Sequence, residues 1–410
     1  MFDLNLSSEQ IEFREMVRSF ATNEIRPAAL KPDRLEPFAK PLLIDLLNET
    51  SALGLRTLTM SEDNGGVGAN TLSSCIVIEE LASGDVDIAA VMGRTELLAR
   101  ELFDVHMTEG QREQFLETFH GDETFHVAYT GSDPDANLGW SYHDDAVSDA
   151  ASPPAAKLDG DDYVINGTID HVANAPVAGL MAVEVKTGKG SGTSALLVPR
   201  ETKGLTISDP LDAIKGTHIR WHHGAAAKVT FKDCRVSKAS LLGAEGQNPL
   251  VASGFFTKET LQRASINLGL GQVAFKTAIE YAGIRRQGAR NIIEHQNLGD
   301  KIADMAIKLE LARTMIWKAA WAVDNPEAVG QGSISDLPLS LVASTFTVES
   351  VQDITVLAAE FFGAMGVMRD MPLQKFVNDS NIFANSADHD IATKLRIAEA
   401  VVGYVRARAA

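Results

Sequence analysis

The spacing of apolar residues divides the chain into three regions. Residues 1–123 and 244–410 repeat apolar positions near the 3.6-residue period of an α-helix, whereas residues 124–243 contain short β-rich runs separated by turns. The pattern therefore predicts an α+β protein: an N-terminal all-α domain over 1–123, a middle antiparallel β-barrel or sandwich over 124–243, and a C-terminal four-helix bundle over 244–410.

Capping residues mark helix ends in the first region. Ser7 with Gln10 forms a capping box, and Pro27 is expected to end the helix that follows. Gly54 is expected to close a second helix over 41–53. Further helices are expected over 71–82 (capped by Thr71), over 87–103 and after a second capping box at Thr108 and Gln111.

The middle region has no helix-length pattern between its apolar runs. No G-x-G-x-x-G follows a strand, so a Rossmann nucleotide site is unsupported. The expected strands are 125–130, 163–165, 179–185, 194–199 and 227–231.

The third region is organised around a helix that begins at Phe255 and runs nearly thirty residues without a proline. Three arginines, Arg285, Arg286 and Arg290, crowd the turn that ends it. They predict a bound phosphate or, alternatively, a solvated turn whose cations offset the helix dipole. Further helices are expected over 297–323, 337–362 and 388–408.

Composition narrows the class of partner. The net charge of −18 over 410 residues disfavours nucleic acid and anionic membranes. Cys75 and Cys234 are expected to be buried free thiols, and no secretory signal or membrane-length apolar stretch is visible, so a cytoplasmic protein is expected.

Arg94 projects from an apolar helical stripe. Such an arginine either extends its head group to water or faces a cavity and binds an anion. Arg94 is therefore a candidate substrate-binding residue.

Four groups of short motifs occur in order along the chain, and together they resemble the acyl-CoA dehydrogenase superfamily. They read Leu53-Gly54-Leu55, Asn64-Gly65-Gly66-Val67-Gly68 and Glu79-Glu80-Leu81-Ala82 near the start; Tyr163-Val164-Ile165-Asn166-Gly167 and Phe231-Lys232-Asp233-Cys234-Arg235-Val236 in the middle; Tyr281-Ala282 with Arg285, Ile292 and Gln296 after the long helix; and Phe361-Phe362-Gly363-Ala364-Met365-Gly366 near the end.

The resemblance implies a homodimer or homotetramer that binds FAD between barrel and bundle, with two subunits completing each site. It places Arg285 and Gln296 on the pyrophosphate and adenosine side of FAD. It also places Thr130 at the flavin ring and Arg263 near the acyl thioester. The turn containing Gly363 and Gly366 would lie beneath the adenosine half.

The usual catalytic glutamate of the family is missing. Its position falls on Ser386 or Ala387, and the alternative position, just before Arg263, is Gln262, an amide without useful basicity. Three carboxylates remain as surrogates, although each has a structural interpretation: Glu259 could pair with Lys258 or solvent, Asp388 could cap the last helix, and Asp390 could sit in its first turn.

The expected flavin shell departs from the family as well. Thr130-Gly131-Ser132 replaces the usual Thr-Glu-Pro, and His171 replaces an indole that covers the flavin. Ser132 and His171 thus remain cofactor-binding candidates. The loop from Gly216 to Ala226 holds His218, His222 and His223, which could suggest a metal, but a solvated loop is favoured and no metal site is expected.

The resemblance implies an FAD-dependent oxidoreductase that acts on an acyl-CoA thioester, with α,β-dehydrogenation as the default. Three alternatives stay open because the base is missing: redox-neutral elimination, flavin monooxygenation, and a non-catalytic chain of a hetero-oligomer whose homologous partner supplies the base and FAD.

Overall fold

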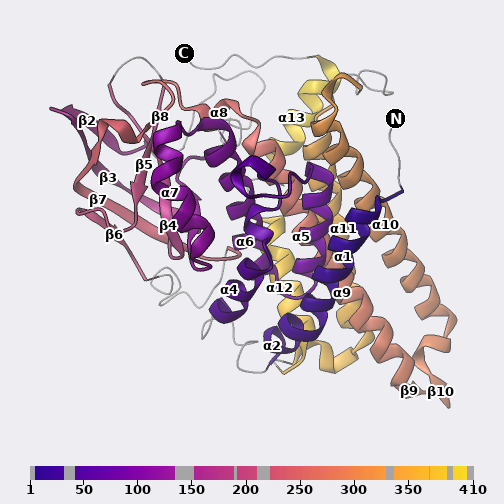
Figure 1. Ribbon diagram of the computed structural model, residues 1–410. Helices are drawn as coiled ribbons and strands as arrows, with labels where there is room; N and C mark the ends of the chain where they lie inside the picture. Colours follow the sequence, from indigo (N-terminus) through magenta and orange to yellow (C-terminus); the bar gives the residue numbers. More distant parts are fainter. Residues whose placement is uncertain are drawn as a thin grey trace. The chain divides into compact units, whose positions relative to one another are not determined.

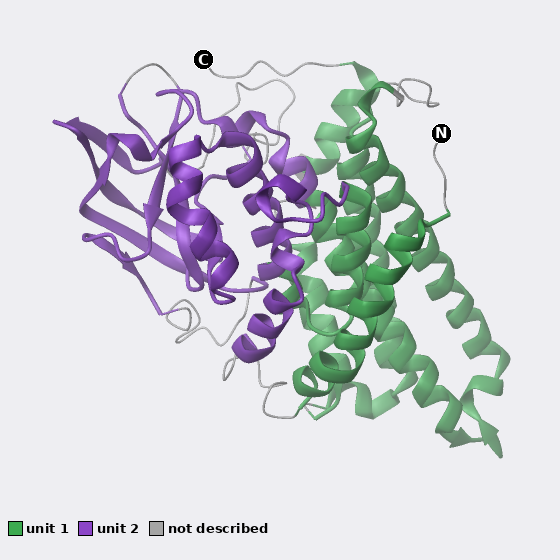
Figure 2. Cartoon of the chain, viewed as in Figure 1, with its two compact units in different colours: residues 1–41, 71–90, 260–405 green, residues 42–70, 91–259, 406–410 purple. Residues whose placement is uncertain are grey.

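A computed structural model describes residues 5–31, 42–133, 152–188, 192–209, 222–328, 337–368, 370–385 and 391–403. The chain forms two compact units that interleave along the sequence (Figure 2). Unit 1 contains residues 1–41, 71–90 and 260–405, and unit 2 contains residues 42–70, 91–259 and 406–410. Helices α6 (Val86–Ala99) and α9 (Phe255–Ile284) each cross a boundary between the units.

Unit 1 is helical apart from a two-stranded hairpin that follows α9 (Figure 1). Its elements are α1 (Ser8–Phe20), a π-helical turn (Ala21–Ile25), α2 (Arg26–Ala29), α5 (Thr71–Ala82), most of α9, β9 (Arg286–Gln287), β10 (Arg290–Asn291), α10 (Gln296–Asp324), α11 (Leu339–Phe361), α12 (Pro372–Ala384) and α13 (Ile391–Val402).

Close backbone packing and buried ion pairs hold these helices together. A Cβ at Gly269 of α9 would lie 2.3 Å from the carbonyl oxygen of Glu79 in α5, so glycine lets the two backbones approach. Glu79 is paired with Arg313 of α10 at 2.7 Å, and Arg18 of α1 pairs with Glu80 at 2.5 Å. Burial raises the pKa of Glu79, and Arg313 opposes that rise. Removing either arginine would therefore leave a carboxylate buried without its counter-ion.

Unit 2 combines helices with two four-stranded sheets. The sheets have the orders β1-β4-β5-β8 and β2-β3-β7-β6. Apolar side chains from both sheets form one core, as in a sandwich. The elements are α4 (Ile44–Ala52), the rest of α6, a π-helical turn (Arg100–His106), α7 (Glu109–Gly121), β1 (His126–Tyr129), β2 (Ala155–Asp159), β3 (Asp162–Ala173), β4 (Ala178–Val185), β5 (Ser194–Pro199), β6 (Leu205–Ile207), β7 (Ala226–Ser237), β8 (Leu241–Leu242) and α8 (Pro249–Ala252).

The α+β class is confirmed, but closure into a barrel is not. The described strands of unit 2 form two sheets that are linked by an isolated parallel bridge between Ala155 and Lys186. Within the sheets, β1 pairs with β4 in parallel, whereas the other strand pairs are antiparallel. A tight hairpin forces its two strands to be antiparallel, but β1 enters from α7 and is free of that constraint.

Two helix predictions need correction. The helix does not end at Pro27, because a π-helical turn precedes α2 and places the proline in the first turn of α2, where its missing N–H costs no hydrogen bond. Helix α12 was not predicted, although its buried residues Leu373, Phe376, Asp379, Ser380 and Phe383 follow the helical period. The capping boxes at Ser7 and Thr108 are confirmed.

Thr71 does not cap α5 as expected. It is the first residue of the helix, and its hydroxyl donates to Asp324 of α10 at 2.7 Å. Within the residues the structure describes, no helix has a segment both long enough and apolar enough to cross a membrane.

Candidate active site

Thr130 follows the last residue of β1 and is fixed by β4. Its N–H donates to the carbonyl of Ala182 at 3.1 Å, and its Oγ1 accepts the N–H of Glu184 at 2.8 Å. The hydroxyl proton of Thr130 is not used in these bonds, so it can be donated to a ligand. Thr130 is half-buried and Ser132 is exposed.

Gly131 is dictated by the tyrosine two residues before it. A Cβ at this position would lie 2.2 Å from the Tyr129 hydroxyl oxygen. That hydroxyl is buried and accepts a hydrogen bond from Asn248 Nδ2 at 2.8 Å. Burial, reinforced by Glu184, raises the pKa of Tyr129, so the phenol remains neutral. Packing against Tyr129 therefore accounts for a glycine at residue 131, where the expected Thr-Glu-Pro motif has a glutamate.

Arg94 and Glu259 form an ion pair within unit 2. The guanidinium of Arg94 on α6 bonds to the carboxylate of Glu259 on α9, and its Nη2 also donates to the carbonyl of Tyr129 at 3.3 Å. Their side chains are 15% and 16% exposed, so neither extends into bulk water. The alternative partner for Glu259, Lys258, pairs instead with Glu101 at 2.8 Å.

Gln262 lies on α9 within unit 1. Its side chain is buried, and Nε2 donates to Ser74 Oγ of α5 at 2.8 Å. A buried, neutral amide therefore occupies this position on α9. Arg263, the next residue, is half-buried.

Arg285 lies at the end of α9 that carries the β9–β10 hairpin (Figure 1). Its side chain is exposed and makes no hydrogen bond or ion pair within the described residues. One turn earlier, the ring of Tyr281 stacks on Phe362 with 3.9 Å between centroids and 15° between planes. This contact brings the Arg285 end of α9 beside the glycine turn that follows α11.

Both glycines of that turn are required by the backbone. Gly363 has a φ of 57°, and a Cβ at Gly366 would lie 2.3 Å from the carbonyl oxygen of Ala359. The hydroxyl of Tyr281 further donates to Met365 Sδ at 3.7 Å. Gln296 is the first residue of α10 and is exposed.

The remaining candidates are separate from these groups. His171 is exposed on β3, with its ring centroid 5.2 Å from that of His222. Among the described residues, no cluster of three His, Cys, Asp or Glu side chains could hold a metal ion. Ser386, Ala387, Asp388, Asp390 and His218 lie outside the described residues.

The structure thus gathers the candidates into two groups, each within one unit. In unit 2, Arg94 and Glu259 are joined through the Tyr129 carbonyl to Thr130. In unit 1, Arg285, Gly363 and Gly366 are joined by the stack of Tyr281 on Phe362. Sequence reasoning missed Tyr129, Asn248 and Ser74. The one signal for Tyr129 was the glycine at 131 in place of a glutamate.

Comparisons with known proteins agree in the family they indicate. The profile described as "Acyl-CoA dehydrogenase, N-terminal domain" matches residues 7–121, and "Acyl-CoA dehydrogenase, C-terminal domain" matches residues 250–386. The mitochondrial isobutyryl-CoA dehydrogenase of Dictyostelium discoideum is 29% identical over 398 residues, covering 96% of this chain and 89% of that protein. A short-chain specific acyl-CoA dehydrogenase of Clostridium acetobutylicum is 27% identical, covering 93% and 94%.

Solved structures share the fold. The butyryl-CoA dehydrogenase of Megasphaera elsdenii superposes with a TM-score of 0.80 at 23% identity, covering 98% of this chain and 100% of that chain. A glutaryl-coenzyme A dehydrogenase in complex with glutaryl-CoA has a TM-score of 0.80 at 24% identity, covering 100% and 98%.

Proposed function

This chain belongs to the acyl-CoA dehydrogenase superfamily, a family of FAD flavoenzymes, and we propose that it is an FAD-dependent oxidoreductase that removes the α- and β-hydrogens of an acyl-CoA thioester. The observation that carries the proposal is the stack of Tyr281 on Phe362. It brings Arg285 and the Gly363–Gly366 turn, which the family resemblance assigns to one half of FAD, to one end of unit 1.

The described side chains suit a dinucleotide. Arg285 offers an unengaged guanidinium, which binds a diphosphate through charge-assisted hydrogen bonds. Thr130 offers a hydroxyl proton from a position fixed by two hydrogen bonds to β4. When bound, FAD supplies the acceptor for the hydride that leaves the β-carbon. Gln296, Gly363 and Gly366 complete the adenosine side; Ser132 and His171 remain candidates at the flavin.

Arg285 serves a neighbouring subunit in this proposal. It is exposed in the single chain and ends a long helix, so it is accessible to a cofactor held by a second copy. The assembly is accordingly a homodimer or homotetramer. A homologous partner chain is the alternative, and a one-to-one ratio of FAD to this chain in the purified protein would contradict it.

We place the base at Glu259, because its ion-pair partner Arg94 also donates to the carbonyl of Tyr129, the residue directly before Thr130. Hydrogen bonds to the thioester carbonyl acidify the α-hydrogen, and a nearby carboxylate can then accept it. Gln262 and Arg263, on the next turn of α9, are the other candidate catalytic residues. Asp388 is the alternative candidate for the base.

Anaerobic reduction of the bound flavin tests this assignment. Butyryl-CoA and isobutyryl-CoA are expected to bleach the flavin absorbance of the wild type, because relatives are named for these substrates. Glu259→Gln should slow bleaching by roughly 10²-fold or more. Glu101→Gln is the matched control, since it also removes a carboxylate that pairs with a cation between α9 and the segment after α6.

The outcomes separate the assignments. Loss of bleaching in Asp388→Asn alone would move the base to Asp388. Failure of every acyl-CoA to bleach the wild-type flavin would overturn dehydrogenation itself.

A base-free reaction is the second candidate, and the buried neutral amide of Gln262 favours it. Redox-neutral elimination of an anionic group would leave the flavin oxidised while product forms, and monooxygenation would require reduced flavin and oxygen. However, Arg94 is already engaged by Glu259, which counts against Arg94 as the residue that holds a leaving anion.

A further inference from the structure

Arg94 contacts one of the two carboxylate oxygens of Glu259. Its Nη1 donates to Oε1 of that carboxylate. Within the described residues, Oε1 is the oxygen of Glu259 that is engaged, and no group donates a hydrogen bond to Oε2. A carboxylate needs a single oxygen to accept a proton. The contact therefore fixes the side chain of Glu259 and leaves Oε2 available as an acceptor.

Arg94 is also held by groups other than Glu259. Its Nη2 donates to the carbonyl of Tyr129 at 3.3 Å. Its Cζ lies 5.7 Å from the centroid of the buried Phe255 ring, within the range of a cation–π attraction. Both contacts persist when Glu259 takes up a proton. The guanidinium is thus not left without a favourable partner while the carboxylate is neutral.

The segment of α6 that carries Arg94 is fixed against β1. The next residue, Thr95, is fully buried, and its Oγ1 lies 3.0 Å from His126 Nδ1 and accepts Asn174 Nδ2 at 3.2 Å. Burial and the nearby Arg56 lower the pKa of His126 to about 3, so this anchor carries no charge near neutral pH. Hydrogen bonds from neutral groups therefore hold α6 at a defined position relative to β1.

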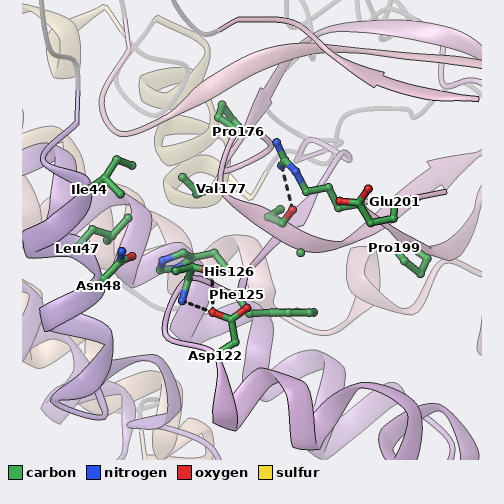
Figure 3. Close-up of a pocket in the computed structure, with 14 residues that line it drawn as sticks. Ile44, Leu47, Asn48, Asp122, Phe125, His126, Pro176, Val177, Pro199 and Glu201 are labelled. Atoms are coloured by element: carbon green, nitrogen blue, oxygen red, sulfur yellow. Dashed lines mark hydrogen bonds between the residues drawn. The ribbon is translucent and has the colours of Figure 1, made fainter. Parts of the chain in front are cut away.

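Among the described residues, Arg94 is the cation that forms an ion pair with Glu259. The neighbouring cation, Lys258, is engaged by Glu101 at 2.8 Å. Asp122 lies at the opposite end of β1, on the wall of a separate pocket that also contains the first residue of that strand (Figure 3). Burial without a counter-ion favours the neutral form of a carboxyl group. The ionised form of Glu259 thus depends on Arg94.

We propose that Arg94 is a positioning residue for Glu259: it keeps the carboxylate ionised, fixes Oε1 and leaves Oε2 to take the α-proton of the thioester. The inference rests on the proposed dehydrogenase function. It assigns Arg94 to the base instead of to the substrate. Loss of Arg94 should therefore slow the chemical step with little effect on the binding of acyl-CoA.

Anaerobic flavin reduction by butyryl-CoA, followed by stopped flow, tests this role. Arg94→Gln removes the charge, so the limiting rate should fall roughly tenfold or more while the half-saturating concentration of butyryl-CoA changes little. The acid limb of the pH profile should also move to higher pH. Arg94→Lys keeps the charge and should restore most of the rate and the position of the acid limb.

Arg200→Gln is the matched control. It also removes a guanidinium of unit 2 that donates to backbone carbonyls, but Arg200 lines the separate pocket of Figure 3. The limiting rate and the pH profile should both stay at the wild-type values in this variant.

Infrared difference spectra between proteins with glutamate and glutamine at residue 259 report the protonation of Glu259 without turnover. Glu259 should be ionised near neutral pH in the wild type and neutral in Arg94→Gln. This result in a wild type that butyryl-CoA does not bleach would overturn the dehydrogenase function and leave the role of the ion pair standing.

Two results would overturn the role of Arg94. One is a Glu259 that is equally ionised with and without the arginine. The other is a higher half-saturating concentration of butyryl-CoA at an unchanged limiting rate, which would mark Arg94 as a substrate-binding residue. If Arg94→Gln does not fold, the infrared titration of the wild type decides alone, and a neutral Glu259 at pH 7 contradicts the proposal.

Discussion

Gly131 lies directly beside the ring of Tyr129, so that a Cβ at residue 131 would come within 2.2 Å of the tyrosine hydroxyl oxygen and 2.3 Å of Cζ. The ring cannot move aside easily, because it is buried and held by Asn248. The strand end that presents Thr130 is therefore shaped by the core of unit 2.

We expect Gly131→Ala to lower the free energy of unfolding by about 1–3 kcal/mol, the usual cost of overpacking. Urea unfolding of the purified protein measures it. Ser132→Ala is the control, since Ser132 is exposed. Tyr129→Phe should not relieve the strain because Cζ remains, whereas Tyr129→Leu should reduce the cost of the alanine. Additive effects in the Gly131→Ala, Tyr129→Leu double variant would show that the two residues do not compete for space.

Arg285 gives the sharpest test of the cofactor assignment. Loss of a charge-assisted hydrogen bond to a diphosphate costs about 1.5–3 kcal/mol, so Arg285→Gln should weaken FAD binding roughly 10- to 100-fold. Fluorescence titration of the apoprotein with FAD measures the change.

Arg290→Gln is the matched control for charge, because Arg290 lies in the same hairpin and is also exposed. Equal losses in both variants would indicate only a general electrostatic effect of the hairpin. In that case the FAD affinities of the two variants should decrease to the same extent as the salt concentration rises.

The fold could be predicted from the sequence further than the site. The capping boxes and the long proline-free helix are local, so Ser7, Thr108 and Phe255 marked their elements correctly. The pairing of strands depends on contacts between distant parts of the sequence. The parallel pairing of β1 with β4 joins residues about fifty positions apart. The partner of Glu259 was missed for the same reason: Lys258 is its neighbour in sequence, but Arg94 reaches it through the fold.

Gln262 provides a gain-of-function prediction that rests on the dehydrogenase proposal. Its buried amide holds Ser74, and glutamate has nearly the same shape. Gln262→Glu should therefore place a carboxylate where the family resemblance implies the base of some members. In the Glu259→Gln background, this substitution should restore anaerobic bleaching of the flavin by butyryl-CoA.

The neighbouring side chain supplies the control. Ser74→Ala should leave the chemistry of Gln262→Glu intact while costing about 1 kcal/mol of stability, because it removes one hydrogen-bond partner. Failure of Gln262→Glu to restore bleaching, in a variant that still holds FAD, would remove residue 262 from the vicinity of the α-carbon.

His126 should make the protein sensitive to acid. Its pKa is lowered from 6.5 to about 3 by burial and Arg56, so the unfolded chain binds a proton between these values and the folded chain does not. The stability contributed by the neutral ring is complete above pH 6.5 and is lost progressively as the pH falls toward 3. Between pH 7 and pH 5 the wild type should lose about 2 kcal/mol more unfolding free energy than His126→Gln, which has no titrating group there. Urea unfolding at the two pH values measures this difference. Equal losses in the two proteins would mean that the imidazole takes up a proton as readily in the folded state as in the unfolded chain.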